Sequence, residues 1–121
     1  MDGINLAQKF TKFADHWSPR IIAQLNDYHV KIAKVEGRFP WHSHADTDEL
    51  FMVIEGHLFI DIRDGRKEST VEIAKGEVFV VPKGTEHAPH AAEECHILLL
   101  EPAGTVNTGD AEEEGTTGVW I

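Results

Sequence analysis

Three histidines and one glutamate form the most informative pattern in this sequence of 121 residues. His42 and His44 are separated by one residue, Glu49 follows shortly after them, and His87 lies much further along the chain. Imidazole nitrogens and a carboxylate oxygen are ligands that suit divalent Fe, Mn, Ni, Co, Cu or Zn. Because the set contains no thiolate, a closed structural zinc site is disfavoured. Four protein ligands would leave two adjacent positions open on a six-coordinate metal for water, dioxygen or a chelating substrate.

Strand alternation predicts how the first three of these residues converge. Side chains on a strand point alternately to its two faces, so His42 and His44 can share an inward face. Glu49 follows at a distance that leaves room for a turn, which places it on the next strand. Phe51 and Val53 have the same parity as Glu49, so we expect both side chains to line a cavity beside the ligands.

Turn residues explain how the more distant histidine can reach the same place. Gly76 and the tripeptide 82–84, Pro-Lys-Gly, precede His87. A tight turn at the tripeptide would bring a later strand alongside the earlier ligands. The sequence therefore predicts one site built from two separate segments.

The elements that must position these residues are mostly short strands. Apolar or alternating runs bounded by turn residues occupy residues 20–25, 28–36, 49–54, 58–62, 71–73, 78–81 and 95–100. Many short strands at this spacing favour an all-β sandwich or closed barrel over a βαβ fold. A change of apolar phase near Ala33 indicates a bulge or bend in its strand.

Both ends of the chain differ from this central pattern. Residues 4–14 have the spacing of a short amphipathic helix. We expect the core barrel at about residues 20–102, followed by an acidic, loop-rich tail at residues 103–121. The tail ends on the apolar residues 119–121, which we expect to dock on the domain or on a partner subunit.

Composition narrows the class of protein. The length suits one domain over residues 1–121, and the net charge is −10, with no Lys or Arg after Lys83. Such an acidic surface repels a phosphate backbone, so we expect no nucleic-acid partner. There is no apolar run of roughly 18 residues and no apolar stretch after a basic start, so we expect neither a membrane span nor a secretory signal. Cys95 is the only cysteine, which favours a reducing compartment, the cytoplasm.

The two ligand blocks resemble the two motifs of the cupin superfamily and, with the strands between them, cover about residues 37–100. In the first block the His-x-His is followed by a four-residue gap to Glu49 and a six-residue gap to Gly56. The gap from Gly37 to His42 is one residue shorter than the usual pattern. The short segment between the blocks resembles small single-domain microbial cupins.

The second block matches over residues 76–87, where the glycines, the proline and the histidine have the usual spacing. It departs from the family where an Asn often stands, because this chain has Ala91 there. The neighbouring His90 is expected to supply a polar group in its place. Glu49 and His90 are therefore the predicted catalytic residues.

The resemblance implies a double-stranded β-helix, a jelly-roll barrel with a metal near one mouth. It implies one divalent transition metal per subunit, held by His42, His44, Glu49 and His87. Such proteins commonly form homodimers, often with N-terminal strands exchanged or packed between subunits. A small-molecule ligand, a homodimeric partner and no nucleic acid or membrane are the corresponding expectations.

Three functions are consistent with these features. The first is a metal-dependent enzyme that acts on a small oxygenated organic substrate, in the manner of a dioxygenase. The second, a sugar or sugar-phosphate isomerase or a polyketide cyclase, also belongs to the range of cupin activities. The third is a module that binds a small ligand without catalysis. Few basic residues lie near the blocks, with Arg38 in the first and Lys83 in the second, which gives little support to a phosphorylated substrate.

Overall fold

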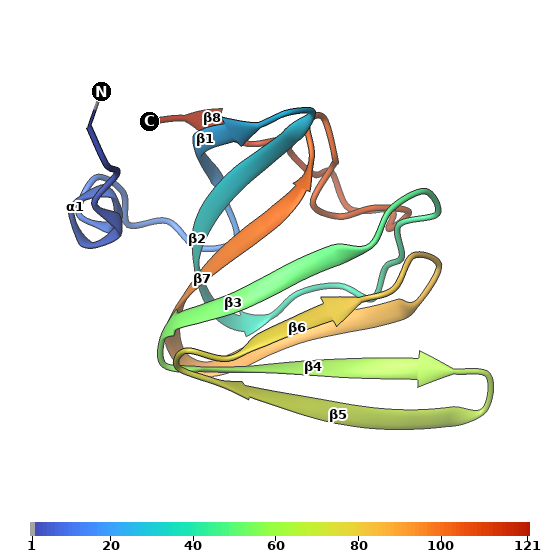
Figure 1. The fold of residues 1–121 in the computed structure, drawn as a ribbon. Coiled ribbons are helices and arrows are strands. Elements are labelled where there is room, and N and C mark those ends of the chain that lie inside the picture. Colours follow the sequence, from blue (N-terminus) through green and yellow to red (C-terminus); the bar gives the residue numbers. More distant parts are fainter. Residues whose placement is uncertain (1) are drawn as a thin grey trace.

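A computed structural model describes residues 2–121, which form eight strands and one short helix (Figure 1). Helix α1 (Leu6–Phe10) comes first. The strands are β1 (Arg20–Leu25), β2 (Tyr28–Arg38), β3 (Glu49–Glu55), β4 (His57–Asp64), β5 (Lys67–Ala74), β6 (Val78–Val81), β7 (Glu86–Pro102) and β8 (Val119–Trp120). The predicted all-β class with a short N-terminal helix is confirmed.

Strand β7 organises the sheet. It pairs with β2 along most of its length, while its first part also pairs with β4 and its last part with β3. The resulting order is β5-β4-β7-β2-β1-β8, with β3 joining β7 and β6 joining β3. In Figure 1 this long strand runs through both walls of the jelly roll, whose sheet does not close and has its edges at β5, β6 and β8. The interior between the walls holds the main hydrophobic core.

A bulge bends β7 where it passes from one wall to the other. Val35 of β2 pairs with Cys95, whereas Gly37 pairs with Ala91, so residues 92–94 face a shorter stretch of the partner strand. An extra residue in one strand bends it and increases its twist. The bend lets one strand contribute to both walls.

The pattern of apolar residues in β2 changes phase near Ala33, but not because of a bulge at that position, as the sequence suggested. Ile32 and Ala33 are both buried, on opposite faces of β2. Ala33 belongs to the core inside the roll, whereas Ile32 packs outside it with Phe10 and Phe13. The sheet is therefore covered on both faces at this point, and the register shift lies further along, between Val35 and Gly37.

The N-terminal helix is shorter than the predicted range of residues 4–14. The side chain of Asn5 accepts a hydrogen bond from the backbone N–H of Gln8 and so caps the first turn. The helix ends after Phe10, but the chain continues along the sheet so that Phe13 is also buried. Apolar contact with the sheet, rather than helix length, holds this segment in place.

The C-terminal end docks on the same sheet, as its apolar residues predict. Val119 and Trp120 pair in parallel with Arg20 and Ile21 of β1. The N–H of Ile121 donates to the carbonyl of Ile21 at 3.1 Å. The described part of the chain, residues 2–121, has no helix long and apolar enough to cross a membrane.

Candidate metal centre

Two reciprocal backbone hydrogen bonds bring the two ligand segments together. The N–H of His42 donates to the carbonyl of His87 at 3.0 Å, and the N–H of His87 donates to the carbonyl of His42 at 2.9 Å. The N–H of Gly84 donates to the carbonyl of His44 at 2.8 Å, so the turn before β7 is fixed as well. The predicted approach of the second segment to the first is therefore made by the backbone.

All four predicted ligands lie together and are buried. His42, His44, Glu49 and His87 each offer one ligand atom, and these atoms lie within 4.8 Å of one another. The Glu49 oxygens lie 3.5 Å from Nε2 of His44 and 3.4 Å from Nε2 of His87. The first residue of β3 thus faces the histidines of both segments.

Backbone carbonyls set the orientation of two of the imidazoles. Nδ1 of His42 lies 2.8 Å from the carbonyl of Pro40, and Nδ1 of His87 lies 2.8 Å from the carbonyl of Thr85. A carbonyl can only accept a hydrogen bond, so each Nδ1 carries the proton. Each Nε2 then presents its lone pair to the cluster, which is the tautomer that binds a metal.

The cluster contains polar atoms that the protein itself does not satisfy. Among the described residues, Nε2 of His44, Nε2 of His87 and Oε1 of Glu49 are buried without a hydrogen-bond partner. Leaving such atoms unpaired costs about 1–3 kcal/mol each. A divalent cation would accept all of these lone pairs at once, so the donor set fits a transition metal.

The protonation states also suit a cation. Burial, with the neighbouring His87, lowers the pKa of His42 to about 4, and burial lowers the pKa of His44. Burial alone would raise the pKa of Glu49, but the neighbouring polar groups of His87, Glu101 and His44 outweigh it and lower the pKa to about 2. Near neutral pH His42, His44 and Glu49 therefore offer unprotonated ligand atoms.

Two residues of the acidic tail, Gly109 and Asp110, pack against Ser43, which lies between the ligands His42 and His44. The carboxylate of Asp110 accepts hydrogen bonds from the backbone N–H of Ser43 at 2.7 Å and from its hydroxyl at 3.0 Å. Gly109 has φ of +52°, and a Cβ there would lie 2.4 Å from the carbonyl oxygen of Ser43. The tail is therefore packed against the ligand loop, a role that its composition does not indicate.

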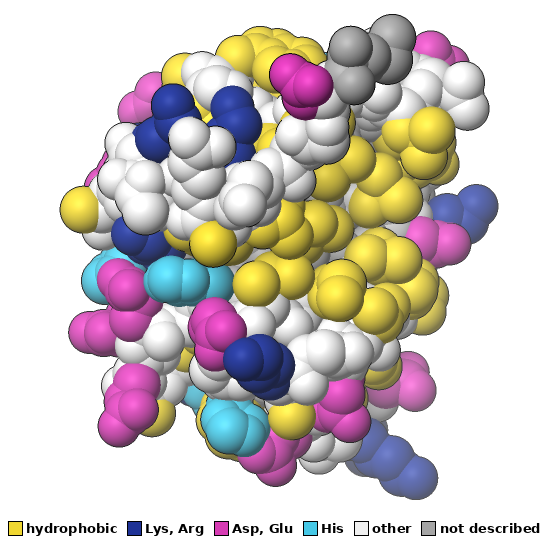
Figure 2. Space-filling view, turned by 60° about the vertical axis from the view of Figure 1, so that its left-hand side comes forward, with side chains coloured by type: hydrophobic (Ala, Val, Ile, Leu, Met, Phe, Trp, Pro, Cys, Tyr) yellow, Lys and Arg dark blue, Asp and Glu magenta, His cyan; other side chains and the backbone are white. Residues whose placement is uncertain are grey.

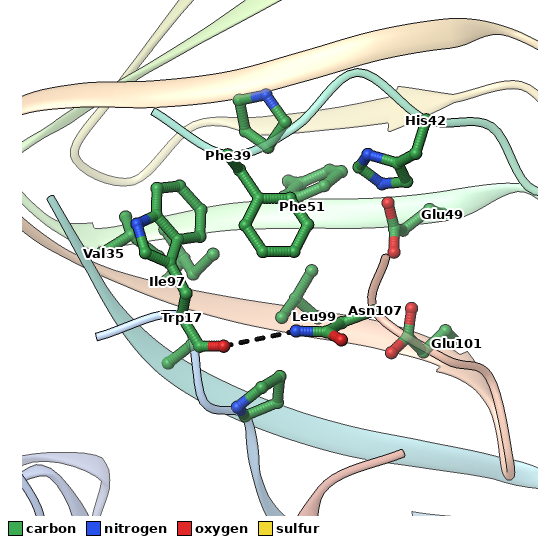
Figure 3. A pocket seen from close by; sticks show the side chains of 13 residues that line it. Trp17, Val35, Phe39, His42, Glu49, Phe51, Ile97, Leu99, Glu101 and Asn107 are labelled. Atoms are coloured by element: carbon green, nitrogen blue, oxygen red, sulfur yellow. Dashed lines mark hydrogen bonds between the residues drawn. The ribbon is translucent and has the colours of Figure 1, made fainter. Parts of the chain in front are cut away.

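A narrow cavity of about 40 Å³ adjoins the ligands (Figure 3). It is lined by Trp17, Pro19, Ala33, Val35, Phe39, His42, Glu49, Phe51, Pro89, Ile97, Leu99, Glu101 and Asn107. Phe51 therefore occupies the predicted position on the cavity wall. Val53 lies in the same hydrophobic core as Phe51 but is not among the residues that line the cavity. The side chain of Asn107 donates to the carbonyl of Trp17 at 3.2 Å, so the tail and the N-terminal segment meet at the cavity.

A buried ion pair beside the cavity was not foreseen from the sequence. Nζ of Lys31 lies 2.8 Å from Oε1 of Glu101, and the two side chains are 0% and 1% exposed. Burial, followed by the nearby Glu49, raises the pKa of Glu101 to about 8. In the sequence, the only indication that these residues are buried is that each stands in an apolar stretch. Lys31 lies between Val30 and Ile32, and Glu101 follows a run of leucines.

His90 lies outside the group of four ligands. Its neighbours Pro89 and Ala91 are buried, whereas His90 is half-exposed, places Nε2 3.0 Å from Oδ1 of Asp61 and stacks on Phe59. Ala91, at the position of the family's Asn, is part of the hydrophobic core. The structure thus provides no contact between His90 and the ligands through which the predicted catalytic role could act.

Comparison with known proteins agrees with this geometry. The family model described as "Cupin domain" matches residues 28–101, more than half of the chain. A crystal structure of a cupin-2 domain-containing protein from Shewanella frigidimarina is 54% identical, with a TM-score of 0.77, and the match covers 82% of this chain and 93% of that one.

Two curated proteins match over shorter regions. The uncharacterized protein YdbB of Bacillus subtilis is 44% identical over 66 residues, which cover 54% of this chain and 56% of YdbB. The 3-hydroxyanthranilate 3,4-dioxygenase 2 of Aspergillus fumigatus is 30% identical over 78 residues, which cover 63% of this chain and 40% of that enzyme. The chain thus spans about half of the length of the curated relatives that it matches.

Substitution of one ligand tests the metal centre directly. We expect His44→Ala to lower the affinity for Mn²⁺ or Zn²⁺ by at least roughly a hundredfold, because one of four donors is lost. Isothermal titration calorimetry of protein stripped of metal measures this. The exposed His57 supplies the control, since His57→Ala should bind metal like the wild type. Equal affinities for all three proteins would contradict the assignment.

The lowered pKa of His42 predicts that the metal-free protein loses stability in acid. Between the ordinary pKa of 6.5 and the folded value of about 4, the unfolded chain binds a proton that the folded chain does not. The free energy of unfolding should therefore fall as the pH drops through this range, by about 3 kcal/mol. Urea unfolding at about pH 7 and about pH 4.5 measures the change. His42→Gln should reduce this pH dependence and His57→Gln should not; equal slopes in both variants would refute the prediction.

Proposed function

Because the chain belongs to the cupin family, we propose that it is a metal-dependent enzyme that oxidises a small oxygenated organic molecule with dioxygen. One observation carries the proposal: four buried ligands with unsatisfied atoms adjoin a cavity with mainly apolar walls. The 30% identity to a protein named as a 3-hydroxyanthranilate 3,4-dioxygenase supports the same class of reaction. Iron, when bound, would supply the redox chemistry with dioxygen that the side chains lack.

The residues of the chain would contribute binding, orientation and exclusion of water. His42 and His87 keep their Nε2 atoms directed at the site, because carbonyls hold the opposite ring nitrogens. Phe39, Phe51 and Leu99 form an apolar wall beside the ligands (Figure 3). Such a wall keeps bulk water from a bound substrate and strengthens the electrostatic interactions within the site.

Oxygen consumption tests this function. We expect protein loaded with Fe²⁺ to consume dioxygen with catechol, 2-aminophenol or 3-hydroxyanthranilate, with both oxygen atoms entering the product. Glu49→Gln should abolish uptake, because one metal ligand loses its charge. The exposed Glu72 provides a matched control, and Glu72→Gln should retain full activity. Stoichiometric iron without uptake on any of these compounds would contradict the proposal.

We also propose that the protein forms a homodimer through the outer face of the wall formed by β6, β3, the last part of β7 and β2. Strand register aligns two apolar rows across β6, β3, β7 and β2, namely Val80, Leu50, Leu100 and Val30, and Val78, Met52, Leu98 and Ile32. Helix α1 covers the Ile32 end, but Val78 and Val80 remain 53% and 45% exposed. Figure 2 shows hydrophobic side chains gathered over one face of the molecule. A contiguous apolar face of this kind is typical of a protein interface.

A charge on this face should separate the subunits. We expect Val80→Asp to raise the dimer dissociation constant more than tenfold, because a carboxylate would be desolvated in the interface. Light scattering coupled to gel filtration at micromolar concentration measures the mass. Val106→Asp, at an exposed valine of the tail, should leave the dimer intact. A monomeric wild type would reject the proposed homodimer.

The cytoplasm remains the proposed location of the protein. The thiol of Cys95 is buried, and burial raises its pKa to about 11. An inert, unpaired thiol is consistent with a reducing compartment.

A further inference from the structure

The acidic tail contains a tight turn, residues 106–111, that is bonded to the backbone between two metal ligands. The carboxylate of Asp110 accepts hydrogen bonds from the N–H and the hydroxyl of Ser43 at 2.7 and 3.0 Å. The N–H of Asp110 donates in return to the carbonyl of Ser43 at 3.2 Å. Ser43 stands between His42 and His44, so this tail turn holds both polar groups of the backbone that carries two ligands.

Gly109 brings the same turn close to the ligand rings themselves. A Cβ on Gly109 would clash with the carbonyl oxygen of Ser43 and would lie 3.1 Å from Cδ2 of His42 and 3.2 Å from Cε1 of His44. Its φ of +52° is a conformation that glycine adopts without strain. Because the backbone of the tail turn passes so close to two imidazoles, it limits their movement from outside.

The tail turn is itself fixed to three other parts of the molecule. Ahead of the turn, Nζ of Lys31 donates to the carbonyl of Thr105 at 3.3 Å. Within it, the side chain of Asn107 donates to the carbonyl of Trp17 at 3.2 Å, as Figure 3 shows. The N–H of Asn107 donates to the carbonyl of Thr116 at 3.0 Å. The turn is thus held by β2, by the N-terminal segment and by the rest of the tail.

The ligand His44 lacks a restraint that the other two histidines have. Backbone carbonyls hold Nδ1 of His42 and Nδ1 of His87. Among residues 2–121 no carbonyl holds a ring nitrogen of His44 in this way, and its Nε2 is buried without a partner. The contacts of the tail turn with Ser43 and across Gly109 therefore supply a restraint on this ring.

We propose that the tail turn is a clasp on the metal centre, with Gly109 and Asp110 as positioning residues, so that metal binding and docking of the tail strengthen each other. Holding Ser43 keeps His44 near its ligating orientation, so less conformational freedom is lost when the metal binds. Because coupling between two binding equilibria is reciprocal, the metal stabilises the docked tail by the same factor. The inference rests on the proposed function only in taking the four ligands to bind a metal.

Two substitutions of Asp110 separate its hydrogen bonds from its charge. We expect Asp110→Ala to lower the affinity for Zn²⁺ roughly tenfold, the lower end of the effect of groups that support metal ligands. Asp110→Asn removes the charge but keeps an oxygen that can accept from the N–H of Ser43, so it should restore most of the affinity. Glu112→Ala, at an exposed carboxylate of the same tail, should bind Zn²⁺ like the wild type.

Titration calorimetry of the four proteins, stripped of metal, measures these affinities. An affinity unchanged in Asp110→Ala would overturn the clasp. Equal losses in the alanine and asparagine variants would assign the effect to charge alone and would overturn it as well.

A pair of glycine substitutions tests the close approach to the rings. Gly65, in the turn between β4 and β5, has a φ of +61°, but a Cβ there would meet nothing within 4 Å. Alanine should therefore cause similar backbone strain at both glycines, and only Gly109→Ala should weaken Zn²⁺ binding, by roughly tenfold or more. Equal affinities in the two variants would contradict the positioning role of Gly109. The substitutions of Asp110 still decide the proposal if Gly109→Ala does not fold.

Hydrogen exchange of backbone amides tests the reciprocal effect. In the wild type, saturation with Zn²⁺ should slow the exchange of the amides of Asp110 and Ala111 roughly tenfold, since the metal stabilises the docked turn. In Asp110→Ala this slowing should be largely lost, and the amides of residues 64–67 in the β4–β5 hairpin should not respond in either protein. Equal exchange of the tail turn in the metal-free and Zn²⁺-loaded wild type would refute the coupling.

The two proposals fail separately. Zn²⁺ has no redox chemistry, so none of these measurements depends on a reaction with dioxygen. A tail coupled to Zn²⁺ in a protein whose iron form consumes no oxygen would reject the proposed oxidation and retain the clasp. Oxygen uptake by a protein whose tail does not respond to the metal would retain the function and reject the clasp.

Discussion

The paired backbone hydrogen bonds between His42 and His87 are the contact on which the site depends. They join the loop after β2 to the start of β7, two segments that are far apart in the chain. Carbonyls two residues earlier in each segment then orient the rings of both histidines. The direction of the ligand atoms is therefore set by the backbone, which is more rigid than side-chain packing alone.

Without a bound metal, the buried ligand atoms of this site reduce the stability of the fold. Several ligand atoms are buried without partners, and the carboxylate of Glu49 lies among three imidazoles in a region without bulk water. The surrounding elements hold the arrangement, with the bend of β7 joining the two walls and Asp110 tying the tail to Ser43. A bound divalent cation would satisfy the orphaned atoms and convert part of this cost into binding energy.

The residues around the ligands, rather than the ligands themselves, set the character of the cavity. A fold of this kind hosts many activities, so the ligand set alone does not select a substrate. Glu101 and Lys31 determine the polarity of the cavity, and Trp17 and Asn107 meet where the N-terminal segment and the tail approach it. The polarity and shape of the cavity thus depend on residues contributed by β2, β7 and both terminal regions.

Local rules of the sequence predicted most of the strands, the ligand set and the inward position of Phe51, because alternation and turn chemistry act over a few residues. They did not predict β8 or residues 86–94 of β7, whose pairing depends on distant segments. The same rules did not identify Ala33 as a point where both faces of the sheet are covered, because the outer covering by α1 depends on tertiary packing. Lys31 and Glu101 lie 70 residues apart, and no local pattern pairs them. The sequence by itself determined which side chains could bind a metal, whereas only the tertiary structure decided the buried ion pair, the supporting tail and the outward position of His90. Those features depend on which distant segments the bent sheet brings into contact.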